Sequence, residues 1–242
     1  MAAFSERLAA ARVRERWTRV YREEPEVFRA FEAAEDPGGL AAERLRELAG
    51  TDGRRVLELG CGTGWLTRRL APGAASYLAL DASASMLELA RHELADLTQE
   101  RRGLLQLKRG RAERLPVLGG SVERVVASWV LLDLRPAVRA AAAAEARRVL
   151  APGGQLWLVE NVGTSEFQEL RGLVDDAGLG EARPLVEDLG LELCEVVETE
   201  LRFESPAAAA RVLGAILGDE VRAELERRPR ARIGLDVGLF SS

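Results

Sequence analysis

Between residues 54 and 162, short apolar runs alternate with amphipathic segments, and this alternation constrains the fold more than any other feature. The apolar runs have strand length, and the segments between them have the spacing of helices. The predicted strands are 54–60, 76–81, 104–110, 123–129 and 155–162, and the longer predicted helices are 65–71, 83–97 and 136–150. This pattern is typical of βαβ units, so we predict an α/β fold with helices on both faces of a mostly parallel sheet.

The sequence on either side of this region has a different rhythm. Residues 1–50 have helical spacing and predict an N-terminal helical extension, followed by a core over 51–242. Within the core, 163–190 and 205–229 are predicted helical elaborations, and 191–203 and 231–240 are predicted strands. At 242 residues, one elaborated domain is favoured over two equal domains.

Composition narrows the class of protein. The net charge is −5, and Lys108 is the only lysine, so the arginine content reflects residue bias rather than a basic surface for nucleic acid. No apolar run has the length of a membrane span, and the N-terminus lacks the pattern of a secretory signal. Cys61 and Cys194 are too few for a disulfide framework or a metal cluster. We therefore expect a cytoplasmic protein without a metal site.

The stretch "VLELGCGTGWL" (56–66) is a strand followed by three glycines at alternate positions and then by a helix. In parallel α/β sheets a ligand binds beyond the carboxyl ends of the strands, where such a loop lies. The dinucleotide fingerprint G-x-G-x-x-G would need a glycine where Trp65 stands. Glu58 would also repel a pyrophosphate. The loop therefore favours a ligand with a nucleoside and a positive charge, and it disfavours a nicotinamide-dependent oxidoreductase.

Asp81 is the candidate for contact with a ribose. It follows the second predicted strand, 17 residues beyond Gly64, near the spacing at which an acid accepts ribose hydroxyls in nucleotide folds. The alternative is that Asp81 caps the helix that begins at Ser83 or Ala84. Its position behind the glycine loop favours the ribose role.

Four stretches in order resemble class I S-adenosylmethionine-dependent methyltransferases. They are "VLELGCGTG", "LALDASASMLELAR", "GRAERLP" and "VLAPGG", within residues 54–161. The chain is most similar to the small-molecule methyltransferases of the ubiquinone-biosynthesis type. The resemblance implies a Rossmann-like sheet of seven strands, with 191–203 and 231–240 forming an antiparallel C-terminal hairpin. It also implies S-adenosyl-L-methionine as methyl donor and S-adenosyl-L-homocysteine as product.

The resemblance further implies which residues bind the cofactor. The glycine-loop backbone would approach the methionine part, and Glu58 would orient that loop or reach the methionine ammonium through water. Met86 would pack on the adenine, and Trp129 would lie near the sulfonium or simply belong to the core. The full implied set is Glu58, Gly60, Cys61, Gly62, Gly64, Asp81, Ala82, Met86, Arg111, Ala112, Glu113, Ser128 and Trp129.

Arg111 departs from the family pattern, because relatives usually have an acid there that meets the adenine amino group. Arginine has no acceptor to offer that amine. Either Ala112 uses its backbone while Glu113 turns inward, or the adenine contact is weakened; Arg111 could also point to solvent.

The sequence also leaves the identity of the catalytic base undecided. The only histidine, His92, stands between charged residues on a predicted solvated helix face. Asp133 and Glu160, at predicted carboxyl ends of strands, remain the candidates for a base. Alternatively, no base is needed, because an aligned approach to a sulfonium supplies much of the acceleration.

We therefore predict a methyltransferase that acts on a small molecule, with neither nucleic acid nor membrane as partner. The N-terminal helices and 163–190 would form a lid over the acceptor, and Trp17, Tyr21 and Phe28 would contact it. The same aromatic stripe at helical spacing also suits simple packing. The alternative function is a non-catalytic subunit that binds S-adenosylmethionine, and the oligomeric state is open.

Overall fold

The computed structural model describes residues 15–21, 23–101, 103–172 and 178–242. The chain forms two compact units, and it enters each of them three times. The first unit comprises Met1–Leu40, Asn161–Glu181 and Glu198–Val237, and the second comprises Ala41–Glu160, Ala182–Val197 and Gly238–Ser242. The predicted domains, 1–50 and 51–242, are each continuous in sequence, unlike these units. That division of the chain stays a prediction.

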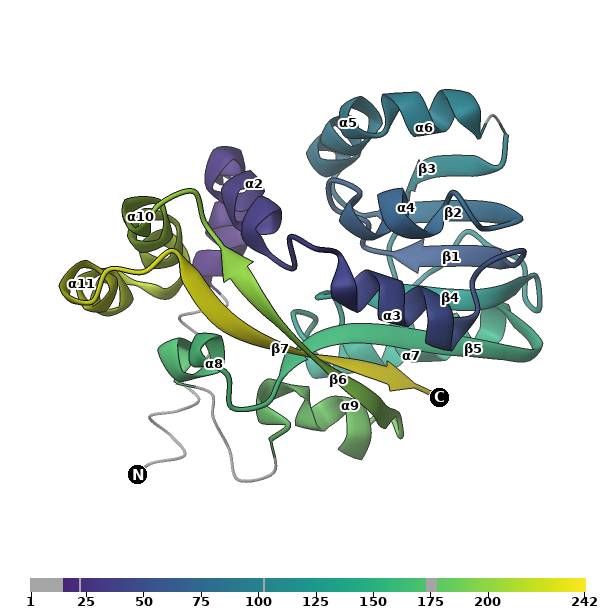
Figure 1. Cartoon of the computed structure of the whole chain (residues 1–242). Helices are drawn as coiled ribbons and strands as arrows, with labels where there is room; N and C mark the ends of the chain where they lie inside the picture. Colours follow the sequence, from purple (N-terminus) through teal and green to yellow (C-terminus); the bar gives the residue numbers. More distant parts are fainter. Residues whose placement is uncertain (1–14, 22, 102, 173–177) are drawn as a thin grey trace. The chain divides into compact units, whose positions relative to one another are not determined.

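A seven-stranded sheet runs in the order β3-β2-β1-β4-β5-β7-β6 (Figure 1). Its strands are β1 (Arg55–Leu59), β2 (Ser76–Asp81), β3 (Leu105–Arg109), β4 (Val122–Ser128), β5 (Leu150–Val162), β6 (Glu192–Arg202) and β7 (Arg232–Ser241). The strands β1 to β5 pair in parallel, and the C-terminal strands are antiparallel. The predicted fold class is confirmed.

The central strands explain why this region forms a parallel sheet. Residues 56–59 of β1 are all buried, and β2 is buried at four of its six positions. A strand covered on both faces is stabilised by burying apolar side chains at successive positions, as in "VLEL" and "YLAL". The one charged side chain in the buried part of β1 is that of Glu58, and it has polar partners described below.

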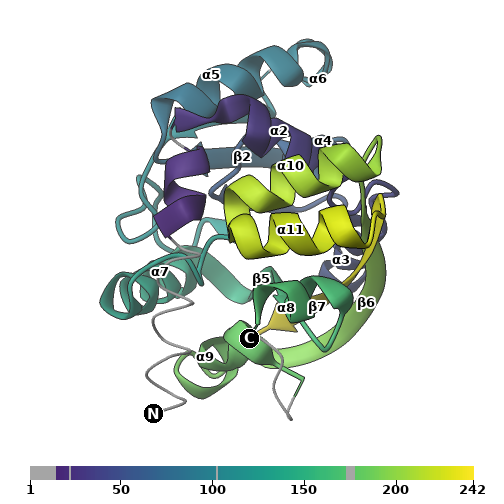
Figure 2. The same ribbon diagram turned by 90° about the vertical axis from the view of Figure 1, so that its left-hand side faces the viewer.

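Helices join and flank these strands. They are α2 (Pro25–Ala34), α3 (Leu40–Ala49), α4 (Trp65–Leu70), α5 (Ala84–Glu93), α6 (Ala95–Glu100), α7 (Pro136–Val149), α8 (Glu166–Arg171), α9 (Arg183–Glu187), α10 (Pro206–Leu217) and α11 (Asp219–Arg227), with a 3₁₀ turn at Gly180–Ala182. In the second unit, α3 and α7 lie on opposite faces of the sheet (Figures 1 and 2). In the first unit, α10 and α11 pack side by side (Figure 2). No helix of the described residues combines the length and apolarity needed to cross a bilayer.

Two element boundaries differ from the predicted ones. The single helix predicted over 83–97 is two helices, because Leu94 leaves helical geometry at φ −108° and ψ 17°. The strand predicted over 155–162 begins earlier, because Leu150 pairs with Val122 of β4. Residues 1–14 of the predicted N-terminal helical extension and residues 173–177 of the helical elaboration predicted over 163–190 lie outside the described residues.

Helix α7 fixes the segment that follows β3. Both oxygens of Glu145 accept from Arg148, at 2.6 and 2.8 Å, and one also accepts from the backbone N–H of Leu115 at 2.8 Å. Arg148 in turn donates to the carbonyl of Val117 at 3.1 Å. Hydrogen bonds from Arg148 and then from Leu115 lower the pKa of Glu145 from 4.5 to about 2, against a smaller effect of burial.

This lowered pKa predicts a pH-dependent contribution to stability. Glu145 stabilises the fold above its ordinary pKa of 4.5, and the contribution disappears as the pH falls towards 2. We expect Glu145→Gln to lower the melting temperature at about pH 7 and to converge with the parent chain in acid. Thermal unfolding across this range measures the effect, with exposed Glu88→Gln on α5 as control. A difference between Glu145→Gln and parent that does not change with pH would contradict it.

Candidate functional site

The sheet order reverses between β1 and β4, which are neighbours although β2 and β3 separate them in sequence. In open α/β sheets, ligands bind beyond the carboxyl ends of the strands at this switch point. The glycine loop follows β1, Asp81 ends β2, and Trp129 follows β4. The candidate site described here is therefore the set of residues at these three strand ends, all within the second unit.

The glycine loop is a tight turn held by backbone hydrogen bonds. The N–H groups of Gly60 and Cys61 both donate to the carbonyl of Leu80, at 2.7 and 2.9 Å. The N–H of Gly64 donates to the carbonyl of Cys61 at 2.8 Å. Gly60, Gly62 and Gly64 have φ values of 69°, 55° and 102°, a region that side chains with a Cβ rarely adopt.

Side chains of the protein itself fill the space beside two of these glycines. A Cβ on Gly60 would lie 2.4 Å from Val130 Cγ2, and a Cβ on Gly64 would lie 2.6 Å from Leu94 Cδ1. Val130 and Leu94 thus occupy the volume that a side chain would need at these positions. At Gly60 and Gly64 the glycine is required by internal packing as well as by the turn.

Asp81 connects the glycine loop to the start of α5. One carboxylate oxygen accepts from the N–H of Gly62 at 2.9 Å, and the other accepts from the N–H of Ser83 at 2.8 Å. The side chain is buried, with 6% exposure. Ser83 is the residue that caps α5, since its Oγ accepts from the N–H of Met86 at 3.3 Å. The alternative prediction that Asp81 is the helix cap is therefore wrong.

Glu58 of β1 accepts hydrogen bonds from side chains of α4 and β2 beneath the loop. Its Oε2 accepts from Thr67 Oγ1 of α4 at 2.5 Å and from the hydroxyl of Tyr77 of β2 at 3.0 Å. Burial, and then the negative charge of Glu58, raise the pKa of Tyr77. Glu58 therefore holds the first turn of the helix that follows the loop. Thr67 and Tyr77 were missed by the sequence reasoning, because nothing in their local pattern links them to Glu58.

Two tryptophans meet at the switch point. Trp65 begins α4 and Trp129 follows β4, and their rings lie edge to face with centroids 5.0 Å apart. Trp129 has φ +52°, an uncommon backbone conformation for a large residue and one that is concentrated at functional sites. The guanidinium of Arg69 lies 4.7 Å from the centre of the Trp65 ring. The Trp65 Nε1 is buried and has no hydrogen-bond partner among the described residues.

The residues implied for the adenine lie after β2 and β3. Met86 is 1% exposed, and the carbonyl of Ala82 accepts from Arg109 at 3.1 Å. Arg111 has a side chain 71% exposed and donates to Glu113 at 2.5 Å, so it points to solvent and not inward. The intervening Ala112 is half-buried. Burial raises the pKa of Glu113, but hydrogen bonds from the backbone of Glu113 itself and from Arg111 lower it by more, so the net effect is a lowered pKa.

The two candidates for a base differ in environment. Asp133 is exposed, whereas Glu160, near the end of β5, is buried at 4% exposure. The N–H of Leu132 points at Glu160 Oε1 from 3.5 Å. Buried Arg139 donates to the carbonyls of the same loop, at 2.9 Å to Leu131. Glu160 therefore lies beneath the loop after β4. Ser128 ends β4 opposite Val159 of β5.

The predicted acceptor residues belong to the first unit and not to the unit that holds the glycine loop. Trp17 packs edge to face on Phe31 at 4.8 Å, and Tyr21 packs in the same way on Phe28 at 5.0 Å. Phe31 also lies 5.9 Å from Phe167 of α8. These rings pack within their own unit, and their contact with an acceptor stays a prediction.

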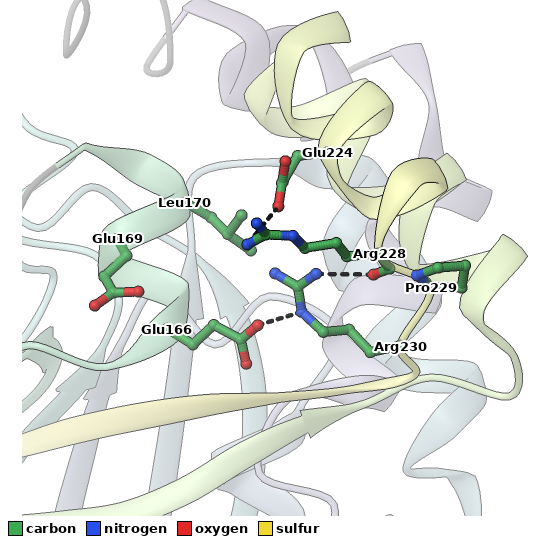
Figure 3. Close-up of a pocket in the computed structure, with 7 residues that line it drawn as sticks. All are labelled: Glu166, Glu169, Leu170, Glu224, Arg228, Pro229 and Arg230. Atoms are coloured by element: carbon green, nitrogen blue, oxygen red, sulfur yellow. Dashed lines mark hydrogen bonds and ion pairs between the residues drawn. The ribbon is translucent and has the colours of Figure 1, made fainter.

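A separate cleft of about 620 Å³ lies in the first unit, between α8 and the chain that joins α11 to β7 (Figure 3). Its lining consists of Glu166, Glu169, Leu170, Glu224, Arg228, Pro229 and Arg230. Arg228 pairs with Glu224 at 3.6 Å, and Arg230 pairs with Glu166. None of the predicted site residues lies in this lining. The described residues also contain no group of three His, Cys, Asp or Glu side chains placed to hold a metal.

Part of this chain is similar in sequence to known methyltransferases. Residues 56–154 match a family described as a methyltransferase domain. An uncharacterised methyltransferase of Mycobacterium tuberculosis is 36% identical over 127 residues, which are 52% of this chain and 47% of that protein. A demethylmenaquinone methyltransferase of Beutenbergia cavernae is 32% identical over 141 residues, which are 56% of this chain and 55% of that protein. The chain thus spans about half the length of the curated relatives it matches.

The solved structures agree on the fold. The YcgJ protein of Bacillus subtilis superposes with a TM-score of 0.60 at 14% identity, covering 84% of this chain and 97% of that one. A protein of Bacillus halodurans described as a putative methyltransferase gives a TM-score of 0.57 at 19% identity, covering 83% and 96%. At such identities the similarity establishes the architecture alone.

Proposed function

We propose that the chain is an S-adenosylmethionine-dependent methyltransferase acting on a small molecule, and the match of residues 56–154 to a methyltransferase-domain family supports this proposal. The observation that carries the proposal is the position of Asp81 at the switch point, with its carboxylate fixed by Gly62 and Ser83. A carboxylate oxygen that accepts one backbone N–H can accept a further hydrogen bond. Asp81 is thus oriented to receive ribose hydroxyls beside the loop.

The neighbouring groups fit the other parts of this cofactor. The buried N–H of Trp65 lacks a partner among the described residues and suits an acceptor such as the methionine carboxylate. The Trp65 and Trp129 rings offer aromatic faces that attract a sulfonium cation. Glu58 positions α4 through Thr67 and so supports the loop. Glu113 remains the candidate acceptor for the adenine amine, provided that it leaves Arg111 on binding.

When bound, S-adenosylmethionine would supply an electrophilic methyl group on a positively charged sulfur. The task of the protein is then to align the acceptor atom with that methyl and to exclude water. Glu160, buried under the loop after β4, is the better placed of the two candidates to take a proton, because Asp133 is exposed. The acceptor is a small molecule in this proposal, since a chain with a net charge of −5 lacks the basic field suited to nucleic acid.

A calorimetric titration of the whole chain tests the proposal. We expect S-adenosylhomocysteine to bind with a dissociation constant in the micromolar range, and NADH to show no binding, because Trp65 and Glu58 oppose a pyrophosphate. Binding of NADH in preference to S-adenosylhomocysteine would overturn the assignment. Turnover with a panel of acceptors then separates an enzyme from a protein that only binds the cofactor.

A further inference from the structure

Arg139, near the start of α7, is a buried arginine. Its guanidinium donates to three backbone carbonyls of residues 129–135, which join β4 to α7 and are called the β4–α7 loop below. The acceptors are Leu131 at 2.9 Å, Leu132 at 3.3 Å and Leu134 at 3.2 Å. Arg139 is 6% exposed, whereas Arg147, further along the same helix, is exposed. Because arginine stays ionised and is rarely buried unless its donors are paired, the carbonyls of the loop account for its position.

The β4–α7 loop is also held from the side of β5. The N–H of Trp129 donates to the carbonyl of Val159 at 2.9 Å, and the N–H of Leu132 points at Glu160 Oε1 from 3.5 Å. Carbonyl groups of the loop therefore turn toward α7, and N–H groups turn toward β5. Since hydrogen bonds from a charged donor are stronger than those between neutral groups, Arg139 contributes strongly to the conformation of the loop.

Two side chains at the start of the β4–α7 loop contact the candidate site. Trp129 meets Trp65 edge to face, and Val130 lies beside Gly60. Trp129 has φ +52°, a strained conformation for a bulky residue, and such strain persists only where the surrounding structure imposes it. The hydrogen bonds from Arg139 supply this constraint on the α7 side. Arg139 thus acts on the candidate site through the backbone of the loop.

We propose that Arg139 is a positioning residue for the methyl donor, because it holds the β4–α7 loop so that Trp129 stays against Trp65. The identity of the donor as S-adenosylmethionine rests on the proposed function, whereas the effect of Arg139 on the tryptophan pair does not. An aromatic face attracts a sulfonium only when it is placed over the cation. A small displacement of the loop therefore weakens binding of the donor.

Circular dichroism of the tryptophan pair tests the positioning itself. Two tryptophan rings in contact give an exciton signal, and the part of the spectrum that Trp65→Phe removes identifies the signal of this pair. We expect Arg139→Met to reduce that signal, because methionine fills much of the same space but donates no hydrogen bond. Arg147→Met is the matched control, since Arg147 donates from α7 to the carbonyl of Leu189 and not to the β4–α7 loop. An undiminished signal in a folded Arg139→Met would overturn the proposal.

Calorimetric titration tests the consequence for binding. We expect Arg139→Met to weaken S-adenosylhomocysteine binding roughly tenfold, and Arg147→Met to bind like the parent chain. Arg139→Lys should recover part of the loss, because an ammonium group donates to carbonyls but lacks the fork of the guanidinium. If Arg139 serves stability alone, Arg139→Met will lower the melting temperature and leave the affinity unchanged. That result would overturn the proposal.

Two further comparisons keep the outcomes distinct. If Arg139→Met does not fold, Arg139→Lys decides the question against Arg147→Lys. We then expect Arg139→Lys to show the weaker tryptophan signal and roughly threefold weaker binding, and equality of the two variants in either measurement would overturn the proposal. If the parent chain does not bind S-adenosylhomocysteine, the proposed function is refuted, while the dichroism comparison still tests the role of Arg139.

Discussion

Replacing Asp81 by alanine is expected to weaken S-adenosylhomocysteine binding by roughly two to four orders of magnitude, from the loss of two hydrogen bonds to a charged acceptor at about 1.5–3 kcal/mol each. The same change leaves the N–H groups of Gly62 and Ser83 without their carboxylate. Calorimetry at constant salt gives the affinity. Asp96→Ala is the matched control, since the Asp96 side chain is 71% exposed and pairs with Arg68.

A ligand variant separates direct contact from loosening of the loop. If Asp81 accepts from the ribose, the parent chain will discriminate strongly against the 2′,3′-dideoxy form of S-adenosylhomocysteine, and Asp81→Ala will not. Equal discrimination by both proteins would mean that Asp81 only shapes the loop. Unchanged affinity of Asp81→Ala for S-adenosylhomocysteine itself would refute the ribose assignment.

The positions of the strands near the site along the chain could be predicted, because they depend on local patterns. The apolar runs that became β1, β2 and β4 are bounded by glycine, aspartate and helical segments, and their periodicity needs no tertiary information. The boundaries that differed depend on distant partners. Leu150 joins β5 because Val122 lies beside it, and no local feature of the turn-like segment 151–154 indicates this.

In the candidate site, too, some residues could be predicted from local spacing and others depend on distant partners. Gly60, Gly62 and Asp81 could be singled out from their spacing, which follows from the loop that joins a strand to a helix. The partners of Glu58, by contrast, lie 9 and 19 residues away on two different elements. From the sequence, Trp65 could be recognised only as the residue that breaks the dinucleotide fingerprint. Its contact with Trp129 joins positions far apart in the chain and could not be predicted. Side-chain partnerships of this kind arise from packing and not from sequence period.

Gly60→Ala is expected to destabilise the second unit by about 2–5 kcal/mol. A positive φ costs an alanine about 1–2 kcal/mol, and crowding in a packed site adds about 1–3 kcal/mol. The crowding arises because the new Cβ would lie 2.4 Å from Cγ2 of Val130, a β-branched side chain with little rotational freedom. Urea unfolding measures the change in the free energy of unfolding.

Two further variants separate these causes. Gly53 has φ +70°, nearly that of Gly60, but a Cβ there would have no atom within 4 Å, so Gly53→Ala should cost only the backbone part. Adding Val130→Ala to Gly60→Ala should recover the crowding part and leave a similar remainder. If Gly53→Ala and Gly60→Ala cost the same, or if Val130→Ala restores nothing, then Val130 does not set the glycine requirement. The close approach would then be reserved for a ligand, as the glycine spacing alone first indicated.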